Sequence, residues 1–163
     1  MIKLHLQTSR CSLRHLSESD LYEAVELFTD SRVRAYLGGP ISEQQAFVKL
    51  QSWISSTDSL YVAIRAVTTN EFIGIISVCP HHENEYMELS YQLLPKFWDQ
   101  GIAAEAIRTI LIHLKESSSI NMLVAETQKK NEKSCKLLKK LGFKPQQTIM
   151  RFGEEQIIFK ICL

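Results

Sequence analysis

A stretch of small residues in the middle of the chain opens a predicted helix. Gly101, Ala103 and Ala104 keep bulky side chains away from its first turn. Backbone N–H groups in a first turn lack intrahelical partners, and the helix dipole is positive there. A helix start of this kind can bind phosphate through its backbone alone. The same residues also fit an ordinary helix start packed against a sheet, so both interpretations stand at this point.

Polar side chains at two other places could take part in acid–base chemistry. Asn131 and Ser134 are three positions apart and therefore share a helix face. Asn131 also suits the N-cap of that helix, and Ser134 fits a solvated, lysine-rich face. Glu88 lies in a predicted strand over residues 86–93, on the face opposite Leu89. A carboxylate held on a strand face is a candidate general base.

The pattern of apolar residues predicts the elements that position these side chains. Helices are expected after Ser17 or Ser19, after Ser42, and over residues 102–115 and 133–141, with Gly142 at the last C-cap. Strands are expected at residues 11–16, 60–67, 72–78, 86–93, 121–126, 148–152 and 156–162, with a polar loop at 81–85. This order predicts one mixed α/β domain over residues 1–163, without a linker or repeat.

Composition argues against several classes of protein. A formal net charge of +1 over 163 residues gives no field that would attract nucleic acid. No apolar run approaches the ~20 residues of a membrane span, and the first residues lack the apolar stretch of a signal peptide. The four cysteines show no Cys-x-x-Cys spacing, and no cluster has metal-ligand spacing. We therefore expect a cytoplasmic protein that binds neither nucleic acid, membrane nor metal.

Three segments, in this order, resemble the GNAT superfamily of N-acetyltransferases, and in particular its RimJ/RimL-like branch. They are Leu13–Leu21, Tyr91–Ala106 and Asn131–Phe143. That branch typically shows a Tyr-Trp-Gly-x-Gly-x-Ala loop and an Asn-x-x-Ser helix that ends in Leu-Gly-Phe. The resemblance covers almost the whole chain. It implies a central, mostly antiparallel mixed sheet that is flanked by helices and splayed at the acetyl-CoA site.

The resemblance implies acetyl-CoA as the cosubstrate. Its pyrophosphate would lie over the turn at 100–104, and its pantetheine amides along residues 92–94, where a backbone N–H near Leu93 would face the thioester oxygen. Two departures from the family pattern are Trp98, in place of a Gln or Arg, and Asp99, whose carboxylate Lys96 could offset. The implied cofactor-binding residues are Gln92, Leu93, Leu94, Trp98, Asp99, Gln100, Gly101, Ile102, Ala103, Ala104, Asn131 and Ser134.

The resemblance also implies the catalytic roles. Ser134 would protonate the departing thiolate, because Leu138 stands where many superfamily members carry a tyrosine. Glu88 is the first choice for the base that helps to deprotonate the acceptor amine, since an ammonium group has no lone pair. The alternatives for this base, in the adjoining loop, are Glu85, His82 and His81.

The acceptor is expected to contact Arg32, Arg34, Tyr36 and Glu88. It is an amine, either a protein N-terminus or a small molecule, and the sequence leaves both open. Family habit implies a homodimer. An alternative of a different class is a non-catalytic CoA-binding or protein-interaction module that keeps the loop at Gly101. A nucleotide-binding domain is disfavoured, because the chain lacks both Gly-x-Gly-x-x-Gly and Gly-Lys-Ser/Thr.

Overall fold

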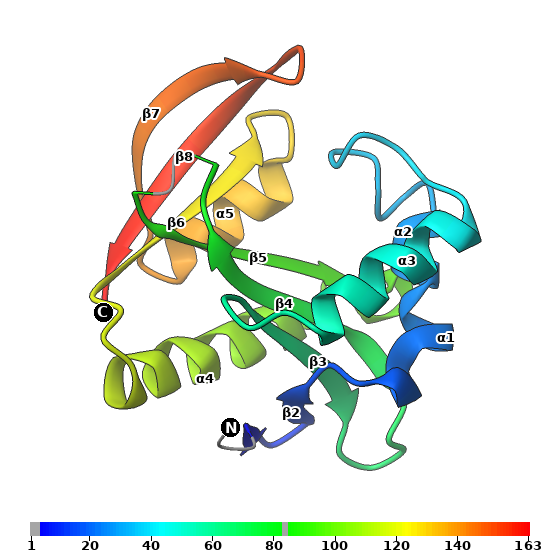
Figure 1. Cartoon of the computed structure of the whole chain (residues 1–163). Coiled ribbons are helices and arrows are strands. Elements are labelled where there is room, and N and C mark those ends of the chain that lie inside the picture. The colour runs from blue at the N-terminus through cyan, green and yellow to red at the C-terminus, as the bar shows by residue number, and fades with distance from the viewer. Residues whose placement is uncertain (1–3, 83–84) are drawn as a thin grey trace.

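An eight-stranded sheet in the order β1-β2-β3-β4-β5-β6-β8-β7 organises the chain (Figure 1). The computed structural model describes residues 4–82 and 85–163, so residues 1–3 and positions 83–84 of the expected loop at 81–85 lie outside the described residues. Neighbouring strands pair antiparallel except β5 and β6, which pair in parallel. The expected mixed, mostly antiparallel α/β sheet is confirmed.

The observed elements extend the predicted ones in a few places. The strands are β1 (His5–Gln7), β2 (Cys11–His15), β3 (Leu60–Ala66), β4 (Phe72–Pro80), β5 (Met87–Leu93), β6 (Met122–Gln128), β7 (Lys144–Arg151) and β8 (Glu154–Cys162). The helices are α1 (Leu21–Ala24), α2 (Glu26–Thr29), α3 (Glu43–Ile54), α4 (Ile102–Ser117) and α5 (Glu132–Lys140), with 3-10 turns at Glu18–Asp20 and Pro95–Phe97. The short strand β1 was not predicted, and the helix expected after Ser17 or Ser19 is divided into a 3-10 turn and the short helices α1 and α2.

The parallel strands β5 and β6 separate soon after they meet. Their register pairs Met87 with Leu123 and Glu88 with Val124, and no further pair follows among the described residues. Beyond this point β5 and β6 diverge, as Figure 1 shows. The sheet is therefore splayed beyond Glu88 and Val124.

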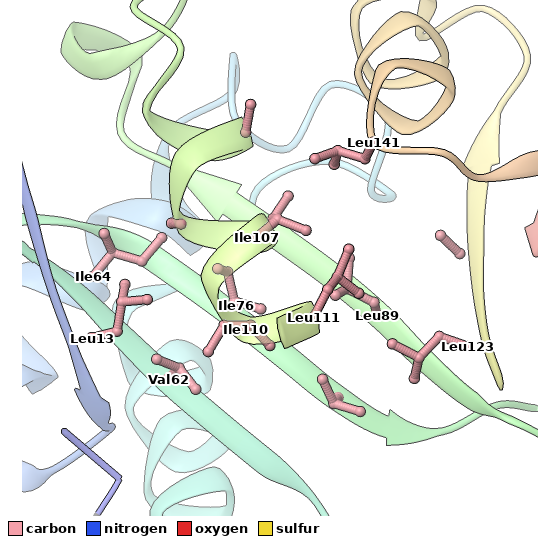
Figure 2. Packing of buried hydrophobic residues seen from close by; sticks show 14 of the residues in the cluster. Leu13, Val62, Ile64, Ile76, Leu89, Ile107, Ile110, Leu111, Leu123 and Leu141 are labelled. Atoms are coloured by element: carbon pink, nitrogen blue, oxygen red, sulfur yellow. The ribbon is translucent and has the colours of Figure 1, made fainter. Parts of the chain in front are cut away.

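Helices cover the two faces of the sheet with separate apolar cores. Helix α4 packs Ile107 and Ile110 against one face, where Leu13, Val62, Ile76, Leu89 and Leu123 are buried (Figure 2). On the other face, Leu27, Phe28 and Leu50 from α2 and α3 pack with Phe72 and Ile75. Since Leu89 points toward α4, strand alternation turns Glu88 and Ser90 toward the opposite face.

Candidate active site

A cavity of about 790 Å³ lies where β5 and β6 part. This volume is in the range of small-molecule and cofactor sites. It brings together most of the residues that the sequence singled out: Arg32, Tyr36, Gln92, Leu93, Trp98, Asp99, Gly101, Ile102, Ala103, Ala104, Asn131 and Ser134. Four predicted site residues, Arg34, Glu88, Leu94 and Gln100, are not part of its lining.

The loop before α4 has the backbone of an anion-binding helix start. Gly101 is the N-cap residue in the left-handed conformation, with φ of 75°, and Asp99 has φ of 58°. The indole Nε1 of Trp98 donates to the carbonyl oxygen of Leu93 at 2.8 Å, which ties the loop to the end of β5. The N–H of Leu94 donates to the carbonyl oxygen of Ile73 at 2.9 Å, so it serves the fold.

An arginine from the β1–β2 turn holds this loop in place. The Nη1 atom of Arg10 donates to the carbonyl oxygen of Gln100 at 2.8 Å, and its Nε donates to Glu105 at 2.7 Å. Burial would raise the pKa of Glu105, but hydrogen bonds from Thr8 and Arg10 lower it to about 2. Sequence reasoning missed Arg10, because it lies 90 positions away from Gln100.

The cation that offsets Asp99 is Lys133. Lys133 Nζ lies 2.7 Å from a carboxylate oxygen of Asp99, whereas Lys96 pairs with Glu71. The prediction that Lys96 would play this part is therefore wrong, because the 3-10 turn at Pro95–Phe97 carries its side chain to the β3–β4 turn. Both partners of the Asp99–Lys133 pair are about 70% exposed, at 70% and 72%, so the pair contributes little to stability and can open for a ligand.

The start of α5 faces a tyrosine across the cleft. Asn131 caps the helix, since its Oδ1 accepts the Ser134 N–H at 3.2 Å. The hydroxyl oxygens of Ser134 and Tyr91 lie 2.8 Å apart. Burial raises the pKa of Tyr91 to about 12, although the hydrogen bond with Ser134 lowers it in part. Tyr91 therefore stays a neutral phenol at physiological pH and can donate a proton.

Sequence reasoning did not choose Tyr91, although it begins the segment that carries the family resemblance. It lies on the same strand face as Leu89 and Leu93, so its pattern is that of a core residue. The cavity also contains Leu138, the residue that replaces the usual tyrosine. Burial raises the pKa of the Cys135 thiol, which is unfavourable for a nucleophilic thiolate.

On the two parting strands, the carboxylate that lines the cavity is Glu126 of β6 rather than Glu88 of β5. Glu126 Oε2 lies 2.9 Å from His81 Nε2, and Arg151 Nε donates to its Oε1 at 2.8 Å. Glu88 lies on the neighbouring strand β5, where it pairs with Val124, and it is not part of the cavity lining. Burial raises the pKa of Glu88, His81 lowers it and Glu126 raises it again. Glu126 could have been noticed as an acidic residue that ends an otherwise apolar strand.

The loop after α2 forms the outer wall of the cavity. Arg32 and Tyr36 line it, and Gln128 Nε2 donates to the Tyr36 carbonyl oxygen at 3.2 Å, linking this loop to β6. Arg34 points elsewhere, because its Nε donates to the Gly39 carbonyl oxygen at 3.0 Å and its guanidinium lies over the Phe28 ring. Its position is explained by the loop that it closes.

Comparison with known proteins agrees with this geometry. The sequence matches the family described as "Acetyltransferase (GNAT) domain" over residues 10–144. The chain belongs to the GNAT acetyltransferase family. The uncharacterized N-acetyltransferase YoaA of Bacillus subtilis is 24% identical over 155 residues, covering 90% of this chain and 86% of YoaA. GNAT enzymes use acetyl-CoA, so the chain is an N-acetyltransferase with that cosubstrate, as the sequence predicted.

Solved structures share the fold of this GNAT protein. A GNAT-family acetyltransferase from Bacillus anthracis superposes with a TM-score of 0.86 at 17% identity, covering 98% of each chain. RimL, the ribosomal L7/L12 alpha-N-protein acetyltransferase in complex with coenzyme A, superposes with a TM-score of 0.84 at 16% identity, again over 98% of each chain. In the part of the chain that the structure describes, no His, Cys, Asp and Glu cluster could hold a metal, and no helix has the length and apolarity to cross a membrane.

Proposed function

We propose that this GNAT N-acetyltransferase transfers acetyl to a primary amine by direct attack in a ternary complex. The observation that carries this proposal is the splayed cleft, which has the Tyr91–Ser134 hydroxyl pair on one side and Glu126 on the other. The amine nitrogen attacks the thioester carbonyl carbon, the C–S bond breaks, and the amine loses one proton while the thiolate gains one. The two polar groups fit these two proton transfers.

Acetyl-CoA is proposed to bind along β5 and over the start of α4. The backbone N–H groups of Gly101, Ala103 and Ala104 would hold the pyrophosphate, where the helix dipole favours negative charge. The backbone of Gln92 and Leu93 would pair with the pantetheine amides. Beyond Glu88, β5 stays paired with β4, but the edge of β5 that faces β6 has no paired strand among the described residues. Trp98, Asp99, Ile102 and Asn131 complete this wall of the cavity.

Ser134 is proposed to protonate the thiolate of coenzyme A, with Tyr91 as its hydrogen-bond partner. When the Ser134 proton moves to sulfur, the Tyr91 hydroxyl can donate to the serine oxygen, since the two oxygens are 2.8 Å apart. A thiol of pKa near 8.5 is already a good leaving group, so the assistance needed is small. Many superfamily members carry a tyrosine at the position of Leu138, and the Tyr91–Ser134 pair is proposed to supply the proton in its place.

Glu88 is proposed as the general base, acting together with Glu126. The raised pKa of Glu88 brings a carboxylate closer to the range in which a base works best. Glu126 borders the cavity and can hold the acceptor's ammonium group or a bridging water. Because the nearby Glu126 carboxylate helps to raise the pKa of Glu88, the assignment is tested on both residues.

The proposed acceptor is the amine of a protein N-terminus or of a small molecule, held near Arg32 and Tyr36. The name of RimL, an alpha-N-protein acetyltransferase with the same fold, supports a protein N-terminus. An α-amino group, with a pKa near 8, also needs less help to lose its proton than a lysine-like amine near 10.4. We place the enzyme in the cytoplasm, since its four cysteines are free thiols. The homodimer expected from the family is tested by sedimentation.

The test begins with thermal unfolding in the presence of acetyl-CoA, with ADP and NAD as controls. Acetyl-CoA at 100 times its dissociation constant should stabilise the fold by about 2.7 kcal/mol. Thiol release is then measured with short peptides that carry a free N-terminus and with small amines, including spermidine. A shift with acetyl-CoA but no turnover with any amine would favour the non-catalytic CoA-binding module. No shift at millimolar acetyl-CoA would contradict the coenzyme site.

A further inference from the structure

One ion pair bridges two walls of the main cavity. Lys133 Nζ, from the first turn of α5, lies 2.7 Å from Oδ2 of Asp99, in the loop before α4. Both residues line the cavity. Among the ion pairs formed within residues 4–82 and 85–163, this is the one in which both charged partners belong to that lining. A ligand in the cavity would therefore meet both charges.

The backbone at Asp99 does not require a carboxylate. Asp99 has φ of 58°, in the left-handed region that glycine adopts most readily and that asparagine and aspartate tolerate best among the other residues. Its side chain does not cap α4, whose N-cap is Gly101. Within the described residues, the contact of its carboxylate is the one with Lys133. The negative charge of Asp99 therefore calls for an explanation other than the shape of the loop.

A coenzyme bound at the start of α4 would bring negative charge close to Asp99. The proposed pyrophosphate site begins at Gly101, two positions after Asp99. A phosphate there is repelled by the Asp99 carboxylate and attracted by the Lys133 cation, which Asp99 holds in the free protein. Lysine has several N–H donors on a flexible stem, so Lys133 can change partner by side-chain rotation alone.

We propose that Lys133 leaves Asp99 for a phosphate of acetyl-CoA when the coenzyme binds, and returns to Asp99 when coenzyme A departs. The inference rests on the proposed position of the pyrophosphate. Asp99 is then an internal competitor for Lys133: it lowers the affinity for the coenzyme and speeds the release of the product coenzyme A. The exchange involves ionic contacts only, and both side chains are exposed enough to move without a change of the backbone.

The test measures acetyl-CoA binding by isothermal titration calorimetry in Asp99→Asn, Lys133→Met and the double variant. Asparagine keeps the left-handed backbone and removes the charge. We expect the Kd to fall by about fivefold in Asp99→Asn and to rise by about tenfold in Lys133→Met. In the Lys133→Met background, Asp99→Asn should change the Kd by less than about twofold, because no cation remains to be exchanged.

Two control variants make the same charge changes outside the cavity. Glu71→Gln removes a carboxylate that pairs with Lys96, and Lys136→Met removes a cation that lies 3.8 Å from Glu132 on α5. Neither Glu71 nor Lys136 lines the cavity, so both variants should bind acetyl-CoA as the wild type does. Thermal unfolding without ligand establishes that every variant is folded. An equal gain of affinity in Glu71→Gln would mean that net charge alone sets the affinity, and would overturn the exchange.

The release rate supplies an independent measurement. Stopped-flow displacement of coenzyme A should show release about fivefold slower in Asp99→Asn than in the wild type. An unchanged Kd in Asp99→Asn would overturn the proposal. A fivefold gain that persists in the Lys133→Met background would also overturn it, since Asp99 would then act by direct repulsion. If the wild type binds no acetyl-CoA at all, the proposed coenzyme site fails and the exchange fails with it.

Discussion

The Arg10 guanidinium donates to the carbonyl oxygen of Gln100 at 2.8 Å, although the two residues are 90 positions apart in the chain. This contact joins the turn after β1 to the loop that precedes α4. The carbonyl of Gln100 belongs to the peptide that leads into Gly101, whose φ of 75° turns the chain into the helix. The conformation of the proposed pyrophosphate site is therefore fixed in part by a residue outside the cleft.

Arg10→Ala should weaken acetyl-CoA binding while leaving kcat largely unchanged. Losing one charge-assisted hydrogen bond of about 1.5 kcal/mol corresponds to an affinity loss of about 10-fold, because the loop must then be ordered by the ligand. Isothermal titration calorimetry with acetyl-CoA measures the change. Arg108→Ala is the matched control, since Arg108 is exposed on α4. Equal affinity of the two variants would show that Arg10 does not support the loop.

A larger side chain at Ala103 should block the start of α4. Ala103 lines the cavity in the first turn of the helix, and the proposed site uses backbone N–H groups at that place. Ala103→Leu should therefore abolish the thermal shift produced by acetyl-CoA, with little change in stability without ligand. Arg108→Leu adds the same side chain on the exposed side of the same helix. An unchanged shift in Ala103→Leu would contradict the phosphate site.

Tyr91→Phe and Ser134→Ala should lower kcat by similar factors and should not be additive. A single neutral hydrogen bond of about 1 kcal/mol corresponds to about a fivefold loss of rate. If Tyr91 acts through Ser134, the double variant should be no slower than Ser134→Ala. Steady-state kinetics of the three variants complete the cycle. Independent, multiplying effects would mean that the 2.8 Å contact between the hydroxyl groups has no part in the reaction.

The pH dependence of the enzyme should report the buried carboxylate Glu88. Its folded-state pKa is raised, first by burial, so the folded protein binds this proton more tightly than the unfolded chain does. Its contribution to stability is therefore favourable at low pH and is lost as pH rises from about 4.3, the unfolded value, through the raised folded value. Glu88→Gln should remove this loss, and the free energy of unfolding measured against pH should be flatter over that window.

The same titration should affect the reaction rate. Only the ionised form of Glu88 can accept a proton, so kcat should rise with pH on an acid limb that lies above the usual glutamate range. Glu88→Gln should lower kcat and remove that limb, whereas Glu85→Gln, in the loop nearby, should keep it. A wild-type limb that persists in Glu88→Gln but disappears in Glu126→Gln would move the base to Glu126.

The sequence by itself determined the features that depend on neighbouring residues. Gly101 and Asn131 lie at the starts of α4 and α5 because a left-handed turn and an N-cap need those residue types. Alternation along β5 placed Leu89 in one core and Glu88 on the opposite face. The order of apolar segments was enough to predict one mixed α/β domain, whereas the splayed sheet was implied by the family resemblance.

Tertiary structure alone decided which polar groups meet. Tyr91 and Ser134 are 43 positions apart, and His81 and Glu126 are 45 apart. Side-chain periodicity specifies the face on which a residue lies, but it does not specify which residue of another element lies opposite. That depends on where β5 and β6 part and on how α5 packs beside them. For the same reason the cationic partner of Asp99 is Lys133 on α5 rather than Lys96, its near neighbour in sequence.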